Sequence, residues 1–341
     1  MAERINWVDF AKGLAMILVV LGHTICDNDL KKFIFVFHMP FFFIMAGYLL
    51  NLEKWGGAEN YKKFSAKLFK RLLLPYYLAN FLCYPIWFVV CHEMGHLPIV
   101  WSRIPEEPIE PFLAIFIGNG NGQGLILEYM WFLPALFFSE IIFIRLYNRL
   151  NKISGEIFIC AIIFCSLLGI LIGKISFLPL GTDIALAAQI FLLAGVLIRK
   201  YNVVEQLNLK ICVPLMVIVV AAFCLNLFVA MNVRRYGEPF LFYAGALAST
   251  LIVMKISALM TDGKIFSLIS ECGRQSMMIL VLHLISANIF YKIIVGALNF
   301  PVEKIFTEPA VVFGAVLSGV LIPLFLAKKF GRLPVLKYFC V

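Results

Sequence analysis

Repeated apolar runs of membrane-spanning length are the feature of this sequence that most limits its fold. A helix needs about 20 mostly apolar residues to cross the hydrocarbon core of a bilayer. We count about ten such runs, centred near residues 17, 42, 82, 138, 165, 191, 221, 250, 285 and 318. Hydrophobic residues make up 62% of the chain and charged residues 14%, which excludes an ordinary soluble domain. We therefore predict an all-α, polytopic membrane bundle of about ten transmembrane helices with no separate soluble domain.

Basic residues concentrate in alternate loops between these runs, whereas the long 92–128 loop is acidic. Cytoplasmic loops of membrane proteins carry an excess of lysine and arginine, so this pattern predicts that both termini are cytoplasmic. The loops also account for the formal net charge of +9, which therefore does not indicate a nucleic-acid partner. The basic loop residues are Lys54, Lys62, Lys63, Lys67, Lys70 and Arg71; Arg145, Arg149 and Lys152; Arg199, Lys200 and Lys210; and Lys328, Lys329, Arg332 and Lys337.

One loop breaks this alternation, because Arg234 and Arg235 fall on the predicted outer side. Such a pair of arginines can anchor a loop to lipid headgroups. It can also bind an anionic acceptor molecule. The residues alone leave both interpretations open.

Ionisable side chains lie inside apolar sequence in the stretch from Asp9 to Pro40. Each such group costs about 2.5–3.5 kcal/mol on insertion scales, so it is rare in lipid unless it has a function. Lys12 and His23 are separated by about three helical turns, so on a helix they would lie on the same face, about 16 Å apart along the axis. We predict that a second helix opens with His38, with Pro40 in its first turn. The resulting hairpin would bring His23 and His38 together at the outer level of the bundle.

Histidine can take or give a proton near neutral pH, which makes it the usual general acid or base. A single histidine in a membrane helix is more often a satisfied hydrogen-bond partner. Two histidines at one level, with Lys12 on the same stripe as the first, favour catalysis. His23 and His38 are therefore the candidate catalytic residues.

A competing motif is the His92-Glu93-Met94-Gly95-His96 sequence, which has the HExxH pattern of zinc metalloproteases. On a helix this spacing places both histidines one turn apart, with the glutamate as general base. The motif falls where the third apolar run ends, and Gly95 and Pro98 leave little helix around it. No third ligand is evident downstream, so a solvated loop is the favoured interpretation and we name no metal ligand. A surface metal site without catalysis and an intramembrane metalloprotease are the less favoured alternatives.

Five segments of the chain resemble, in order, the motifs of acyltransferase family 3, the integral membrane O-acyltransferases that modify bacterial glycans. The family's first helix usually carries an arginine, ten intervening residues and a histidine; here Lys12 takes the place of the arginine. Lysine keeps the positive charge but loses the bidentate fork, and this form resembles the fucose 4-O-acetylase-like branch. The five segments are DFAKGLAMILVVLGH (9–23), FHMPFFFIMAGYL (37–49), KRLLLPYYLAN (70–80), EYMWFLPALF (128–137) and GRQSMMILVLHLI (273–285).

The resemblance implies one acyltransferase domain over residues 1–341, in the bacterial cytoplasmic membrane. Such an enzyme would transfer an acyl group, acetyl in the first place, from cytoplasmic acyl-CoA to a hydroxyl of a cell-envelope or lipid-linked sugar. Its partners would be acyl-CoA, the glycan acceptor and the lipid bilayer. Acetyl-CoA would act as a donor substrate, with no cofactor permanently bound.

The resemblance also implies roles for single residues. His23 would deprotonate the acceptor hydroxyl or carry the acyl group, and His38 would orient His23, share its proton or bind the sugar. Lys12, Arg71 and Arg274 are the cations best placed by topology to bind the phosphates of coenzyme A, although positive-inside anchoring also explains the two arginines. Glu128 and His283 would line the acceptor pocket; a solvated loop acid and a structural histidine are their alternatives.

A transporter or lipid-linked glycan flippase is the alternative from another class of protein. Many spans with intramembrane charges are compatible with it. A carrier, however, tends to place its charges at the interface between structural repeats. Here the ionisable groups cluster in the first two spans, which favours the acyltransferase.

Overall fold

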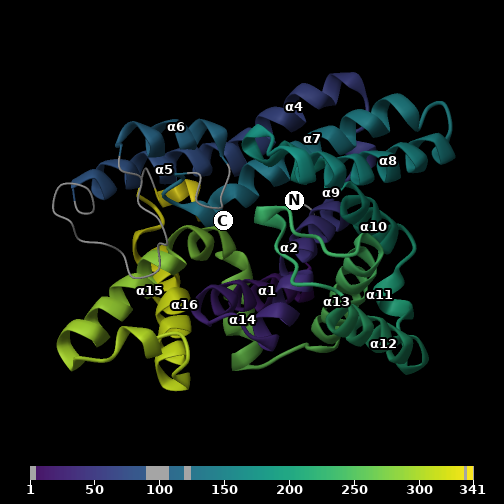
Figure 1. The fold of residues 1–341 in the computed structure, drawn as a ribbon. Coiled ribbons are helices and arrows are strands. Elements are labelled where there is room, and N and C mark those ends of the chain that lie inside the picture. The colour runs from purple at the N-terminus through teal and green to yellow at the C-terminus, as the bar shows by residue number, and fades with distance from the viewer. Residues whose placement is uncertain (1–4, 90–106, 119–123, 334–335, 341) are drawn as a thin grey trace.

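The computed structural model describes residues 5–89, 107–118, 124–333 and 336–340. Over these residues the chain is a bundle of helices, with no strand beyond an isolated bridge between Ala230 and Arg235. Helices α1, α2 and α14 occupy the centre of the view in Figure 1, with α15 and α16 on one side and α10 to α13 on the other. The predicted all-α class is confirmed for the described part of the chain.

Seven of the described helices are long and apolar enough to cross a membrane. Each one contains the centre of an apolar run identified in the sequence, which confirms those runs as candidate spans. Their bounds are α1 Asn6–Thr24, α2 Asp29–Leu49, η3 with α7 Glu128–Leu150, α8 Gly155–Ile175, α13 Pro239–Leu259, α15 Ser276–Leu298 and α16 Pro309–Phe330.

The three other runs form less regular helices. The run near residue 191 is a bent pair, Pro179–Ala187 and Gln189–Lys200 (α10), with an angle of 52° between its halves. The run near 221 is α12 (Leu209–Leu225), which has 17 residues, and the run near 82 is α5 (Leu74–Trp87), which has 14. If the bent pair counts as one span, the described chain has up to 8 candidate spans. The count of about ten stays a prediction.

Shorter helices connect these spans. Amphipathic α14 (Lys264–Arg274) precedes α15, and α4 (Ala58–Leu68) leads through the π-helix η1 (Phe69–Leu73) into α5. The remaining short elements are α3 Leu52–Trp55, α6 Ile109–Ile117, η4 Pro179–Gly181, α9 Thr182–Ala187, α11 Val203–Gln206, η5 Met231–Val233, η6 Val302–Lys304 and η7 Leu336–Tyr338.

The predicted start of the second helix is wrong. Helix α2 begins at Asp29, nine residues before His38, because the side chain of Asn28 caps it by accepting a hydrogen bond from the amide of Lys31 at 2.9 Å. Pro40 therefore lies inside the helix and not in its first turn. A proline there has no N–H to donate, so the carbonyl four residues earlier lacks its usual helical hydrogen bond.

Glycines allow two central helices, α1 and α14, to approach closely. A Cβ placed on Gly273 of α14 would lie 1.8 Å from the carbonyl oxygen of Asp9, and one on Gly13 of α1 would lie 1.8 Å from that of Ile269. Phe10 stacks on Phe266 at the same crossing, with ring centroids 5.1 Å apart. Small residues commonly provide such contacts between membrane helices, and here they fix α14 against the first half of α1.

The break between α9 and α10 is surrounded by buried polar side chains. Ser166 accepts a hydrogen bond from the amide of Ile190 at 3.0 Å, and Gln189 donates to the carbonyl of Ser139 at 3.2 Å and to that of Ala185 at 2.7 Å. Backbone groups released by a helix break inside a membrane need such partners. The bend is therefore held by hydrogen bonds from Ser166 and from the side-chain nitrogen of Gln189, whereas Oε1 of Gln189 is buried and has no partner among the described residues.

Candidate active site

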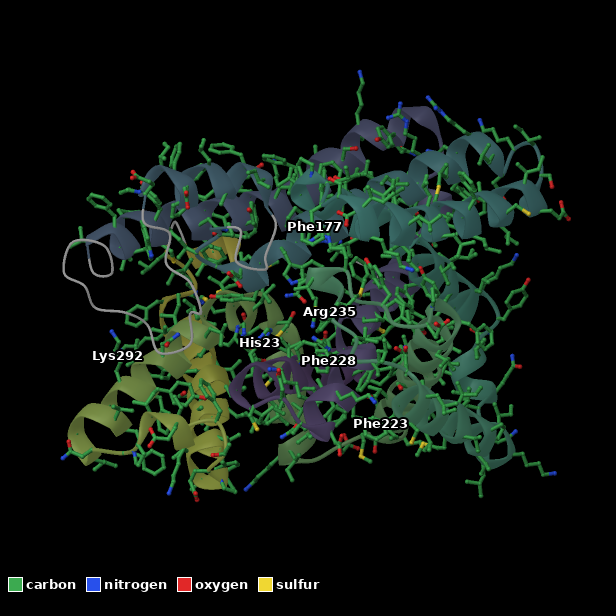
Figure 2. All side chains as sticks on the ribbon, in the orientation of Figure 1. His23, Phe177, Phe223, Phe228, Arg235 and Lys292 are labelled. Atoms are coloured by element: carbon green, nitrogen blue, oxygen red, sulfur yellow. The ribbon has the colours of Figure 1, made fainter. Side chains whose placement is uncertain are left out.

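A cavity of about 390 Å³ lies between the end of α1, the first half of α2, the start of η3, the segment from Phe228 to Arg235, and α15. Figure 2 shows His23, Phe228 and Arg235, all of which line this cavity, gathered in the middle of the molecule. The cavity has an apolar interior and a polar rim, as small-molecule sites commonly have. Its lining residues on these elements are Met16, Val19, His23, Asp27, Lys31, Phe35, His38, Met39, Phe42, Glu128, Tyr129, Trp131, Phe132, Phe228, Ala230, Met231, Asn232, Val233, Arg235, Leu280 and Leu284.

One stripe of α1 forms a wall of the cavity. Met16, Val19 and His23 all line it, and their spacing of three and four residues places them on one helix face. Lys12 belongs to the same stripe, one turn beyond Met16, but it does not line the cavity. The structure therefore brings His23 to the cavity and places Lys12 outside it, at the crossing with α14.

His23 lies beside His283 and not at the level of His38. The ring centroids of His23 and His283 are 5.4 Å apart, although the two residues come from α1 and α15. His38 is nine residues into α2, about 13 Å from the start of that helix, so the expectation that both histidines lie at the outer level is wrong. His38 and His23 share the cavity, and the ring of Phe35 packs near both of them, at 4.6 Å from His38 and 6.3 Å from His23.

Backbone carbonyls determine the tautomers of His38 and His283. Nδ1 of His38 lies 2.9 Å from the carbonyl oxygen of Ile34, and Nδ1 of His283 lies 2.8 Å from that of Leu280. A carbonyl only accepts hydrogen bonds, so in each neutral ring Nδ1 carries the proton and Nε2 carries the lone pair. Nε2 of His283 is buried and has no hydrogen-bond partner among the described residues. It is one of eight buried side-chain atoms in the described part of the chain that lack a partner, and it is the one that lies beside the ring of His23.

Helix η3 adds Glu128 and Tyr129 to the site. Glu128 is half-buried and lines the cavity, and its role toward the acceptor stays a prediction. Tyr129 packs its ring against His283 at 4.7 Å and donates a hydrogen bond to the carbonyl of Val281 at 2.7 Å. Tyr129 therefore holds α15 and His283 in place behind His23, while His283 is itself fully buried and does not line the cavity.

The two arginines expected to bind the donor are each paired with an acid outside the cavity. Arg71, held by the π-helix η1, donates to the carboxylate of Glu140 at 2.5 Å, and its side chain remains 49% exposed. Arg274 donates to Glu271 on the same helix at 2.6 Å. Partial burial, with Arg71 and Lys54 close by, lowers the pKa of Lys67 on α4. Arg71 thus belongs to a basic surface region near Lys67, and Arg274 lies beside Gly273 at the crossing of α1 and α14.

The adjacent residues Arg234 and Arg235 have different environments. Arg234 is buried and forms a two-bond ion pair with Asp183, at 2.6 and 2.9 Å, and its guanidinium lies 4.2 Å from the centre of the Phe177 ring. Headgroup anchoring is therefore excluded for Arg234. Arg235 is exposed and lines the cavity.

A second, smaller cavity of about 280 Å³ lies at the opposite end of α1. Its walls include Trp7 at the start of α1, Tyr48 at the end of α2, and Lys255 near the end of α13. No group of three or more possible metal ligands occurs among the residues that the structure describes. The HExxH sequence from His92 to His96 lies outside those residues.

Sequence reasoning did not identify Tyr129, Phe35, Glu140 or Asp183. The two acids could have been found, because each lies in or beside an apolar run, where an unpaired carboxylate is costly. Their partners could not be assigned, since Glu140 and Arg71 are 69 residues apart and Asp183 and Arg234 are 51 apart. The aromatic residues carry no such signal, because most aromatic side chains in this chain serve packing.

Comparison with known proteins identifies the family. Residues 5–328 match the model of a family described as an acyltransferase domain, acyltransferase family 3. No curated protein and no solved structure matches the chain. The family match extends over nearly all of the 341 residues and includes every residue that lines the cavity of His23 and His38. This helical membrane protein therefore belongs to acyltransferase family 3.

Proposed function

We propose that the protein is an O-acyltransferase of the bacterial cytoplasmic membrane. It moves an acyl group, acetyl in the first place, from cytoplasmic acyl-CoA to a hydroxyl of a cell-envelope or lipid-linked sugar, as in the fucose 4-O-acetylase-like branch. The observation that carries this proposal is the cavity that His23 and His38 line, in a chain that belongs to an acyltransferase family. The cavity accommodates a sugar-sized group and exposes histidine nitrogens to it.

The proposed chemistry is general-base catalysis by His23. The imidazole takes the proton of the acceptor hydroxyl, and the oxygen attacks the thioester carbonyl of the donor. The carbon–sulfur bond then breaks, and the proton passes from the imidazolium to the departing thiolate of coenzyme A. His38 assists by presenting Nε2 to the cavity, because its Nδ1 is held by the carbonyl of Ile34. A variant in which His23 first accepts the acyl group has the same overall balance.

The donor approaches from the end of the bundle where α1 begins. If both termini are cytoplasmic, the crossing of α1 and α14, with Lys12 and Arg274, lies on the side of the cavity from which the donor would approach. Their positive charges, and that of Arg71, would attract the phosphates of coenzyme A. The thioester would then reach His23 along the α1 stripe past Met16 and Val19.

The test measures transfer of labelled acetyl from acetyl-CoA into membrane glycan, with wild type compared to His23→Gln and His38→Gln at matched membrane levels. General acid–base catalysis contributes about 10²- to 10⁴-fold to rate, so we expect His23→Gln to lose that factor. The matched control is Leu21→Ala, which shortens a half-buried side chain of the same helix that does not line the cavity. Equal labelling by wild type and His23→Gln would refute the role of His23.

The two alternative functions receive less support. The bent pair Pro179–Lys200 resembles the discontinuous helices of transporters, but its break does not line the cavity of His23 and His38. A transporter would leave acetyl-CoA unconsumed in the same assay. A metalloprotease would lose activity with a zinc chelator, which we expect to leave acetyl transfer unchanged.

A further inference from the structure

The segment between α12 and α13 holds Arg235 rigidly at the cavity. Ala230 and Arg235 exchange two backbone hydrogen bonds, at 2.8 and 3.1 Å, which close a tight hairpin. The side chain of Asn226 accepts hydrogen bonds from the amides of Leu227 and Glu238, at 2.9 and 2.8 Å, and so ties the two ends of the segment together. The backbone that carries Arg235 is thus fixed at both its ends.

Arg234 adds a second restraint from the other side of the hairpin. Its backbone is in the left-handed region with φ 58°, which is uncommon for a residue with a side chain. The buried ion pair with Asp183 holds it there. With the side chain of Arg234 committed to Asp183, the next residue, Arg235, presents its side chain to the cavity.

The charges that line the cavity are Asp27, Lys31, Glu128 and Arg235, together with the two histidines. Lys31 is paired with Asp27 at 2.8 Å, so these two largely cancel. Glu128 interacts with other groups of the protein. Arg235 forms no ion pair with any residue that the structure describes. A positive charge without an acidic partner thus remains at the rim, where the cavity opens.

We propose that Arg235 binds an anionic group, a phosphate or a carboxylate, on the same acceptor molecule whose hydroxyl is presented to His23. A guanidinium recognises such groups through two parallel hydrogen bonds, which orient the bound molecule as well as attract it. The inference rests on the proposed function for the identity of the acceptor. It names the class of acceptor that the cavity selects: a sugar that carries a negative charge.

Binding to the purified protein in nanodiscs of zwitterionic lipid tests this proposal without relying on catalysis. Three probes separate the sources of charge: methyl glucuronide carries a carboxylate, glucose 1-phosphate carries a phosphate, and methyl glucoside is neutral. We expect at least one charged probe to bind more tightly than the glucoside, and Arg235→Gln to weaken its binding about 10- to 100-fold. Arg235→Lys should retain part of the binding, because it keeps the charge without the fork. Lys292→Gln, an exposed cation on α15 outside the cavity, is the matched control.

Several results would overturn the proposal. Equal binding of the charged probes by wild type and Arg235→Gln is one, and an equal loss for the neutral glucoside, which indicates altered packing, is another. If Arg235→Gln has no effect on probe binding in zwitterionic lipid and a measurable effect only in nanodiscs of anionic lipid, Arg235 anchors headgroups and the proposal fails. Release of coenzyme A from acetyl-CoA in the presence of each probe is measured in parallel. Charge-dependent binding without release in wild type would support the Arg235 site and refute the proposed function, so the two can fail separately.

Discussion

One short hairpin separates two regions of the molecule: the buried ion pair between Asp183 and Arg234, and the cavity around His23. The two regions differ in how their arginines are paired. In the ion pair both side chains are almost completely buried, and the carboxylate receives two hydrogen bonds. At the cavity, Arg235 is exposed and has no ion-pair partner among the described residues. A buried charge needs its partner in order to be tolerated, whereas an exposed charge beside a cavity is available to a ligand.

The largest expected effect is on the ion pair itself. Asp183→Leu leaves the Arg234 charge buried without its acid, and breaking such a pair typically costs about 3–5 kcal/mol. We expect a correspondingly large fall in the melting temperature of the detergent-solubilised protein. The double variant Asp183→Leu/Arg234→Met should recover most of the loss, since it removes both charges. If Asp183→Leu alone is as stable as wild type, the ion pair does not stabilise the fold and the comparison fails.

The crossing of α1 and α14 gives the next largest effect, and it sharpens the comparison because its close contact depends on glycines and backbone atoms rather than on charge pairing. Gly273→Ala places a methyl group against the backbone of α1, and overpacking of this kind costs about 1–3 kcal/mol. We expect lower thermal stability together with lower acetyl transfer. Gly296→Ala is the control, because a Cβ there meets nothing within 4 Å and should stabilise α15 by about 0.5–1 kcal/mol. Equal effects of the two variants would contradict the close helix contact.

A smaller effect is expected at His283, with opposite signs for stability and activity. His283→Phe keeps an aromatic ring against Tyr129 and removes the unsatisfied Nε2. We expect unchanged or higher thermal stability, since a buried unsatisfied group is costly. As a positioning residue for His23, His283 should affect kcat about tenfold and displace the pH–rate profile. A destabilised variant with an unaltered pH profile would show that His283 is only structural.

The smallest effect is expected from the exposed pair at the rim. The side chain of Asp27 is 84% exposed, and pairs of this kind contribute about 0–1 kcal/mol. Asp27→Asn should therefore leave the melting temperature almost unchanged. It also frees Lys31, so binding of glucose 1-phosphate or methyl glucuronide should strengthen by about fivefold at most. Weaker binding of the charged probes would contradict the charge balance described for the rim.

Much of the fold could be predicted from local sequence. Every one of the apolar runs corresponds to a helix, because burial of apolar residues in lipid depends on composition and length alone. The start of α2 could not be located from the proline, because Pro40 suits a first turn as well as it suits the helix interior in which it lies. The amide of Lys31 and the side chain of Asn28 decide that boundary.

The candidate site, too, could be predicted only in part from local sequence. The stripe from Lys12 to His23 follows from helical spacing, and the structure brings three of its positions, Met16, Val19 and His23, to one cavity. The contact of His23 with His283 joins residues 260 positions apart, which no local pattern encodes. The roles of Lys12, Arg71 and Arg274 toward the donor remain predictions.

The sequence by itself determined that the chain is a helical membrane protein of acyltransferase family 3, and that His23 lies near the end of its first apolar helix. These properties depend on composition, periodicity and the order of motifs along the chain. Only the tertiary structure decided that Arg234 stabilises the fold while Arg235 faces the cavity, and that His283 rather than His38 lies beside His23. Neighbours in sequence can face opposite environments, because burial and charge pairing are set by the distant helices that pack around each side chain.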